Sequence, residues 1–346
     1  MVQAICVEME QRKDYLSGET IETIYFGGGT PSLLSIEEVD QLFSGISKNF
    51  VLENDMEITL EANPDDLSPE YLKQLNQLGV NRLSIGIQSF DDKVLKFLNR
   101  RHSAKQAIKS VEDAQNAGFN NISIDLIYAI PDSPAEAWQK SLEQAFNLDI
   151  QHFSAYILTL EIKTLLAQII RTNNIEEITD DECYQQFEML NEAAQKNNFI
   201  QYEISNFGKE GFFSKHNSSY WKNIKYLGVG PSAHSFDLDT RQWNFSNNKE
   251  YLDKVNSKEK YFSTEILEIS EKYNDYILTG LRTMWGISDE YIRTNFGEQY
   301  GQKLIKEIRK NQKSGYVEEY GQNYRITAKA KFITDAIIEG FMIIDD

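Results

Sequence analysis

The sequence predicts an α/β protein built around a parallel sheet, open or closed into a barrel. Short runs of β-branched and aromatic residues alternate with helical patterns through the first half of the chain. Successive runs begin roughly 25 to 40 residues apart, which fits one strand–helix unit each. The hydrophobic fraction of 41% and the charged fraction of 25% are those of an ordinary globular protein.

The elements follow in a regular order after an amphipathic helix near residues 2–15. Five strands are expected, at 23–27, 57–62, 82–87, 122–127 and 153–158. Helical patterns separate them, at 35–49, 68–78, 103–117 and 134–147. Because a helix before the first strand would normally follow a strand of its own, the sheet is expected to lack its first strand and the loop after it.

The second half is less regular. A helical segment at 181–197 precedes a stretch rich in Gly, aromatic residues and His at 199–236. From about residue 264, three helical patterns, a hairpin at 315–327 and a last helix predict a small winged-helix-like domain. The expected division is therefore a partial barrel over 1–165, its completion over 166–260, and the C-terminal domain over 261–346.

Charge and hydropathy exclude several classes of partner. The net charge of −18 opposes nonspecific binding to nucleic acid or to anionic membranes. No run of about 18 apolar residues exists, so a transmembrane helix is not expected. The first residues lack the basic start and apolar core of a secretion signal, which makes the cytoplasm the expected compartment.

A polar group or bare backbone lies at or near the end of each predicted strand. In parallel α/β folds these carboxyl-terminal strand ends meet at one edge and carry the chemistry. Here they are Gly27 to Pro31, Glu61 with Asn63, Gln88 with Ser89, Asp125, and Thr159 with Glu161. The glycine N–H groups can bind a ligand carboxylate, and Arg100 can pair with a second one. The acidic and amide side chains can accept hydrogen bonds from a ligand amine and ligand hydroxyls. Together they describe a nucleoside–amino-acid conjugate, although each alone has a structural explanation.

The chain resembles the radical S-adenosylmethionine (SAM) proteins. The motifs YFGGGTPSLL, LEANPDDLSPEYLKQLNQLGVNRLSIGIQSFDD, LNRRHS, ISIDLIYAIP, YEISNFGK and HNSSYW stand in the order of the oxygen-independent coproporphyrinogen III oxidase family, haem-chaperone (HemW-like) branch. The resemblance implies a partial (β/α)6 barrel with SAM across its rim. It places SAM contacts at Gly28, Gly29, Thr30, Glu61, Gln88, Arg100, Asp125 and Thr159.

The cysteines depart from the family pattern. The family's CxxxCxxC motif, which holds a [4Fe–4S] cluster, is absent, and only Cys6 and Cys183 are present. A cluster needs three protein thiolates here, so both are expected to be inert, and the chain is expected to be inactive in radical chemistry. We expect Met1 to be an internal methionine and the cluster to be held only by a longer protein.

The stretch HNSSYW resembles the HNxxYW motif of the haem-chaperone branch. The resemblance implies haem binding by His216, Tyr220 and Trp221, with His216 as a candidate iron ligand. Imidazole is a common axial ligand, and Tyr and Trp offer flat faces to a porphyrin. His234 is a second imidazole nearby in sequence. The alternative is that His216 is a loop histidine bonded to the sheet, beside packed aromatic residues.

Three functions remain open at this point. The first is a haem chaperone that passes haem to an unidentified acceptor protein. The second is an oxygen-independent coproporphyrinogen III oxidase of porphyrin biosynthesis, which the shared SAM residues do not separate from the first. The third is a cluster-free binding scaffold. A missing strand would also leave a sheet edge through which two copies could form a homodimer.

Overall fold

The computed structural model describes residues 1–159, 164–172 and 175–344. Contacts divide the chain into two compact units. The sheet unit comprises Ile24–Ile36 and Glu57–Ser214. The terminal unit comprises Met1–Thr23, Glu37–Met56 and Lys215–Asp346. The boundaries expected at residues 165 and 260 remain predictions.

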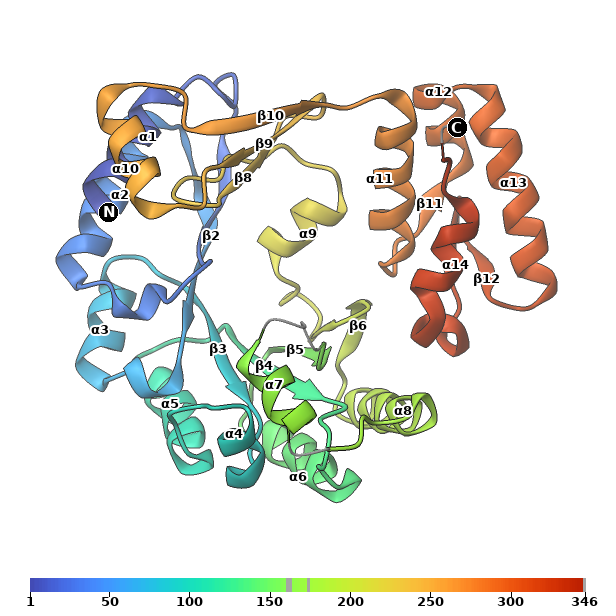
Figure 1. The fold of residues 1–346 in the computed structure, drawn as a ribbon, viewed down its shortest axis with the longest axis horizontal. Coiled ribbons are helices and arrows are strands. Elements are labelled where there is room, and N and C mark those ends of the chain that lie inside the picture. The colour runs from blue at the N-terminus through green and yellow to red at the C-terminus, as the bar shows by residue number, and fades with distance from the viewer. Residues whose placement is uncertain (160–163, 173–174, 345–346) are drawn as a thin grey trace. The chain divides into compact units, whose positions relative to one another are not determined.

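The main sheet confirms the predicted α/β class. Its strand order is β1-β2-β3-β4-β5-β7-β6, and it curls into a half-barrel (Figure 1). Strands β2 to β5 pair in parallel, while β7 runs antiparallel to both β5 and β6. The strands are β1 (Ile21–Phe26), β2 (Leu52–Ala62), β3 (Arg82–Gln88), β4 (Ile122–Tyr128), β5 (His152–Ile157), β6 (Ile200–Glu203) and β7 (Asn206–Gly208).

Helices cover the outer face of this sheet in the sheet unit (Figure 1). They are α3 (Pro69–Gln77), α4 (Asp92–Phe97), α5 (Ala104–Asn116), α6 (Ala135–Phe146) and α8 (Asp180–Lys196), and the unit also contains α7 (Leu165–Thr172). Local capping starts several of them, since Ser68 accepts a hydrogen bond from the Tyr71 amide, and Ser103 and Thr179 form capping boxes.

The two faces of the sheet differ in polarity. Leu83, Ile85 and Ile87 of β3 are fully buried and alternate with Arg82 and Ser84. The same alternation runs through β4, where Ser123 and Asp125 separate the apolar residues. Because side chains of a strand point to opposite faces in turn, one face packs against helices and the other is polar. This polar inner face leads to the predicted site.

The terminal unit begins with α1 (Val2–Gln11) and contains α2 (Ile36–Asn49), α9 (Lys215–Trp221) and α10 (Asn248–Ser257). A second sheet has the order β10-β9-β8, from β8 (His234–Phe236), β9 (Thr240–Asn244) and β10 (Phe262–Ile266). The fully buried Glu8 carboxylate accepts hydrogen bonds from the Gly230 amide at 2.8 Å, Asn244 Nδ2 at 2.7 Å and the Tyr251 hydroxyl. This network ties α1 to the sheet and to α10.

The C-terminal residues form the expected helices and hairpin. The order is α11 (Ile269–Leu281), β11 (Ile287–Ser288), α12 (Asp289–Phe296), α13 (Glu298–Lys313), β12 (Val317–Tyr320), β13 (Asn323–Ile326) and α14 (Thr334–Phe341). Strands β12 and β13 pair antiparallel, which confirms the hairpin predicted at 315–327. The order helix–strand–helix–helix–strand–strand is that of a winged helix, with an apolar core of its own.

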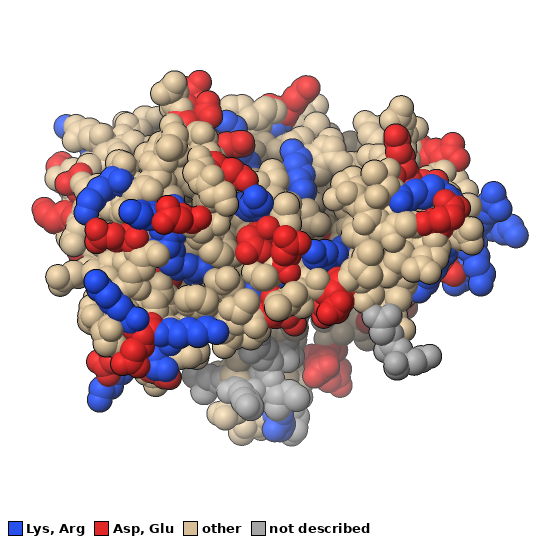
Figure 2. All heavy atoms as spheres, turned by 90° about the horizontal axis from the view of Figure 1, so that it is seen from above, with Lys and Arg blue, Asp and Glu red and all other residues tan. Residues whose placement is uncertain are grey.

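The distribution of charge on the surface is relevant to nucleic-acid binding, which the net charge opposes. Lys and Arg interleave with Asp and Glu on the face drawn in Figure 2, without gathering into one basic field. Nucleic-acid binding normally requires such a field. Across the described ranges, none of the helices is at once long and apolar enough to cross a bilayer.

Candidate functional site

Glu61, next to the last residue of β2, and Asp125, in the middle of β4, form an acidic pair. Ser84 links them, because it pairs with Glu61 in register and its hydroxyl donates to Asp125 at 3.4 Å. Burial and then the negative charge of Glu61 raise the pKa of Asp125 to about 6, against hydrogen bonds from Ser154 and Ser84 and the charge of Arg82. The pair therefore favours a cationic or hydrogen-bond-donating ligand.

Tyr25 supports this pair. It is the first residue of the motif YFGGGTPSLL, but no role was assigned to it from the sequence. Its hydroxyl donates to Glu61 Oε1 at 2.7 Å. Burial, followed by the charge of Glu61, raises the pKa of Tyr25 far above its ordinary value, so the phenol stays protonated and remains a donor. The residue stands two positions before the glycine run, and that proximity is the only sequence signal of its role.

The glycine run brings exposed backbone beside the acids. A Cβ on Gly27 would lie 2.6 Å from the Tyr25 ring and 3.0 Å from Glu61 Oε1, so only glycine fits there. Gly28 has a φ of +71°, and no atom lies within 4 Å of the position of its missing Cβ. Gly29 and Thr30 are also exposed. A ligand can thus approach this backbone closely.

Gln88 and Arg100 meet over Gly86. A Cβ there would lie 3.0 Å from Gln88 Nε2 and 3.4 Å from Arg100 Nη2. Gln88 ends β3 with a φ of +68°, next to an irregularity in the pairing with β4. Arg100 donates to Asn63 Oδ1 at 2.8 Å and to the Gly86 carbonyl at 2.9 Å. Residues following β2 and β3 therefore converge, as their positions at strand ends indicated.

The other predicted strand-end residues, Thr159, Ser89 and Glu161, have different surroundings. Thr159 lies two residues beyond β5 and is exposed. Ser89 is buried and shares a hydrogen bond with Ser141. Glu161 lies outside the described residues.

His102 and His152 are buried and hydrogen-bonded inside the sheet unit. His102 is buried, and its Nε2 lies 3.0 Å from the Ile87 carbonyl. His152 is fully buried between Ser123 Oγ at 2.7 Å and the Tyr202 hydroxyl at 2.8 Å. Burial lowers the pKa of both imidazoles. They belong to the polar interior of the sheet unit, which the sequence did not reveal.

The HNSSYW stretch forms α9 in the terminal unit. His216 and Tyr220 stand four residues apart and so share one helical face. His216 Nε2 lies 3.0 Å from the Tyr220 hydroxyl, and Nδ1 lies 2.9 Å from Thr23 Oγ1 on β1. The side chain is half-buried and bonded to a strand residue, as the structural alternative supposed.

Aromatic rings continue from this histidine. The rings of His216 and Tyr220 meet edge to face at 5.1 Å, and those of Tyr220 and Tyr226 at 4.7 Å. Tyr220 is 39% exposed. The Trp221 Nε1–H is buried without a hydrogen-bond partner among the described residues, and the Arg282 guanidinium lies 5.8 Å from that ring. An imidazole among flat amphipathic rings fits a porphyrin and its iron.

His234 differs from His216 in its surroundings. It is exposed at the start of β8, where it pairs with Trp243 of β9. Trp243 is 37% exposed. His234 thus provides a solvent-facing imidazole in the same unit for comparison with His216.

The cysteines do not fit an iron–sulfur cluster. Cys6 lies in α1 of the terminal unit and Cys183 in α8 of the sheet unit. Burial raises the pKa of both thiols, which opposes the thiolate form that binds metal. Within the ranges that the structure describes, no three His, Cys, Asp or Glu side chains are grouped to hold a metal ion.

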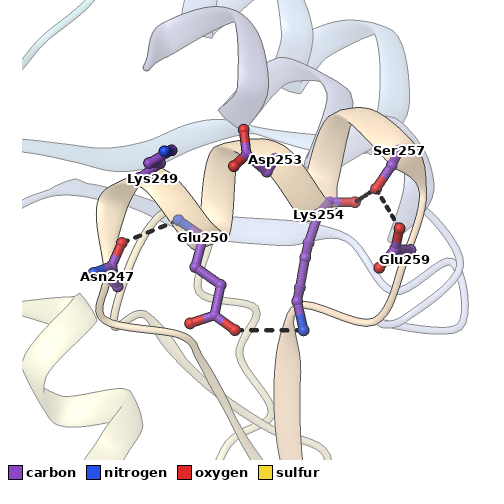
Figure 3. A pocket seen from close by; sticks show the side chains of 7 residues that line it. All are labelled: Asn247, Lys249, Glu250, Asp253, Lys254, Ser257 and Glu259. Atoms are coloured by element: carbon purple, nitrogen blue, oxygen red, sulfur yellow. Dashed lines mark hydrogen bonds and ion pairs between the residues drawn. The ribbon is translucent and has the colours of Figure 1, made fainter.

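A hollow beside α10 is unrelated to these residues (Figure 3). It is lined by Asn247, Lys249, Glu250, Asp253, Lys254, Ser257 and Glu259. Glu250 and Lys254 form an ion pair at 3.4 Å, and Asn247 caps the helix by accepting from the Glu250 amide. These are the features of a solvated helix face, and they supply no convergent chemistry.

Comparisons with known proteins agree with the sequence motifs. The model of the radical SAM superfamily matches residues 7–145. The haem chaperone HemW of Lactococcus lactis is 35% identical over 94% of this chain and 86% of its own length. That of Bacillus subtilis is 36% identical over 82% and 74%, respectively. Among solved structures, the coproporphyrinogen III oxidase HemN of Escherichia coli is similar over 98% of this chain and 82% of its own, with a TM-score of 0.81 and 21% identity.

Proposed function

Because this chain belongs to the HemW haem-chaperone family of radical SAM proteins, we propose that it binds haem and passes it to an acceptor protein. The observation that carries the proposal is the placement of His216, half-buried and with its Nε2 facing a hydroxyl that a ligand can displace. When bound, haem supplies an iron that takes an axial imidazole. His216 supplies that imidazole, while Tyr220 and Trp221 contact the porphyrin.

A haem titration tests this proposal. Addition of haem to the chain is expected to shift the Soret band, and His216→Ala is expected to abolish the shift. His234→Ala is the matched control, since it removes an exposed imidazole from the same unit. Equal spectra for the chain and for His216→Ala would contradict the assignment.

We also propose that the strand ends of the sheet unit bind SAM. Backbone amides of Gly28, Gly29 and Thr30 are offered to its carboxylate, since nothing crowds this backbone. The carboxylates at 61 and 125 suit the amine, the sulfonium charge and the ribose hydroxyls. Gln88, Arg100 and Thr159 complete the proposed contacts. When bound, SAM supplies its sulfonium chemistry.

Membership of the radical SAM family also implies a [4Fe–4S] cluster as a cofactor. We propose that such a cluster forms only where three thiolates are supplied from outside the residues of this chain. Reconstitution with iron and sulfide is expected to leave this chain without cluster absorbance, and to succeed in a version extended by a CxxxCxxC loop. Cluster absorbance in this chain as it stands would overturn the proposal.

An oxygen-independent coproporphyrinogen III oxidase is the second candidate. It rests on the fold shared with HemN. Incubation of the reconstituted extended version with coproporphyrinogen III and SAM is expected to give no decarboxylated product, and clear turnover would favour the oxidase.

We further propose that the protein is cytoplasmic, which cell fractionation tests. We also propose that two copies form a homodimer through the edge strand β1, which analytical sedimentation tests.

A further inference from the structure

Two hydroxyl groups bracket the His216 ring, one at each nitrogen. Thr23 Oγ1 lies 2.9 Å from Nδ1, and the Tyr220 hydroxyl lies 3.0 Å from Nε2. Thr23 belongs to β1 and is 193 residues away in sequence, whereas Tyr220 follows one helical turn later. All three residues belong to the terminal unit.

The pairing of these groups selects one tautomer of the imidazole. A neutral imidazole carries one N–H donor and one acceptor nitrogen, so one hydroxyl must donate and the other must accept. A phenol is far more acidic than an aliphatic alcohol and is therefore the better donor and the poorer acceptor. Tyr220 thus donates to Nε2, and the Nδ1–H group donates to Thr23 Oγ1.

This tautomer leaves the lone pair on Nε2, which is the nitrogen that an iron would bind. Histidines that ligate metals usually donate their other N–H group to a neighbouring oxygen, which fixes both the tautomer and the ring orientation. Thr23 Oγ1 takes the part of that oxygen, and the Tyr220 hydroxyl lies within hydrogen-bond distance of Nε2, the nitrogen that would ligate an iron.

We propose that Thr23 is a positioning residue for His216 and that the Tyr220 hydroxyl occupies Nε2 by a hydrogen bond that an iron would have to displace. This inference rests on the proposed haem function. Thr23 holds the proton on Nδ1 and the ring plane in place. The Tyr220 hydroxyl holds Nε2 by a hydrogen bond in the haem-free protein, and it would have to give up that bond for Nε2 to ligate iron.

Haem titrations of Thr23 and Tyr220 variants test the two roles. Thr23→Val, which keeps the shape but loses the hydroxyl, is expected to weaken haem binding about 10- to 100-fold. Thr23→Ser keeps a hydroxyl and is expected to stay within about threefold of the wild-type chain. Tyr220→Phe removes the competing hydrogen bond and is expected to tighten binding about threefold to tenfold.

The nitrogen-15 NMR spectrum of the haem-free chain tests the tautomer without any cofactor. His216 is expected to show a protonated Nδ1 and an unprotonated Nε2, and Thr23→Val is expected to show a mixture of both tautomers. Thr23→Ser is expected to keep the wild-type pattern. Melting curves of the variants report whether each is folded.

Two results would overturn the inference. One is a wild-type spectrum with the proton on Nε2, which can be recorded even if Thr23→Val does not fold. The other is haem binding by folded Thr23→Val equal to that of the wild-type chain. Failure of the proposed function is distinct, because it would appear as a missing Soret shift in the wild-type chain itself.

Discussion

The two candidate sites of this chain are built from opposite materials. The site in the sheet unit consists of the carboxylates of Glu61 and Asp125, the side-chain amide of Gln88 and the exposed backbone of the glycine run. On α9 of the terminal unit, an imidazole stands in a row of aromatic rings that begins with Tyr220. The first collection suits a small, charged, hydrogen-bonding ligand, and the second suits a flat apolar ligand with a metal at its centre.

The comparison teaches how separable the two sites should be. The acidic pair depends on a pKa that burial and a neighbouring charge have raised, so it responds to pH and to cations. The His216 site depends on two neutral hydroxyls and on ring packing. Changes at one site are therefore expected to leave binding at the other intact.

The largest effect is expected from Glu61→Gln. This change keeps the shape of the side chain and an oxygen that can accept from the Tyr25 hydroxyl, but it removes the negative charge. Loss of a hydrogen bond to a charged group costs about 1.5–3 kcal/mol, so SAM should bind about 10- to 100-fold more weakly. Calorimetric titration measures this, with Glu70→Gln on the exposed surface of α3 as the control. Unchanged SAM affinity would remove Glu61 from the site.

Gly27→Ala should disturb the same site by crowding. The new methyl group would lie 2.6 Å from the Tyr25 ring, so the ring must shift away from Glu61. Overpacking of this kind costs about 1–3 kcal/mol in the free energy of unfolding, which urea denaturation measures. SAM affinity should fall as well, while the haem Soret shift should persist.

Gly340→Ala provides the matched control for this crowding. Gly340 lies in α14, and its added methyl group would lie 3.5 Å from Glu307 Oε2 of α13, an ordinary van der Waals distance. Helix propensity then favours alanine, and stability should rise by about 0.5–1 kcal/mol. Equal destabilisation by the two variants would argue against the steric account of Gly27.

A smaller effect is expected from the pH dependence of stability. The folded pKa of Asp125 is raised from 3.8 to about 6, so the folded state holds more protons than the unfolded state between these values. Stability should therefore fall as pH rises from about 4 to about 6, and the loss should persist above pH 6. Asp125→Asn should raise the free energy of unfolding at pH 7 by about 1–2 kcal/mol. This is less than the full pKa shift would give, because the side chain is partly exposed and solvent screens its charge.

Urea denaturation at pH 4.5 and pH 7 checks this prediction. Asp149→Asn, which changes a carboxylate with an 87% exposed side chain, is the control and should leave the pH dependence unchanged. A wild-type chain that gains stability between pH 4 and pH 6 more steeply than Asp125→Asn would show that the sign is wrong.

The sheet-unit site could largely be predicted from the sequence. Parallel strands must place their carboxyl ends at one edge, so the strand pattern alone was enough to group Glu61, Gln88 and Asp125. Tyr25 could not be predicted, because its hydroxyl reaches Glu61 through the packing of β1 against β2, which a strand pattern does not show.

The terminal-unit site was harder to predict for physical reasons. The sequence of α9, KHNSSYW, is short and contains Asn and Ser, which favour helices weakly, so tertiary packing decides its conformation. The contact between Thr23 and His216 spans 193 residues and leaves no local signal. The three-residue strands β7 and β8 were missed because a period of two needs more residues to show.

Binding of both ligands to the same two variants tests the central claim most directly. Haem and SAM would be titrated separately into the wild-type chain, His216→Ala and Glu61→Gln. The account predicts that His216→Ala loses haem and keeps SAM, and that Glu61→Gln weakens SAM and keeps haem. Full haem binding by His216→Ala, or loss of both ligands in either folded variant, would contradict it.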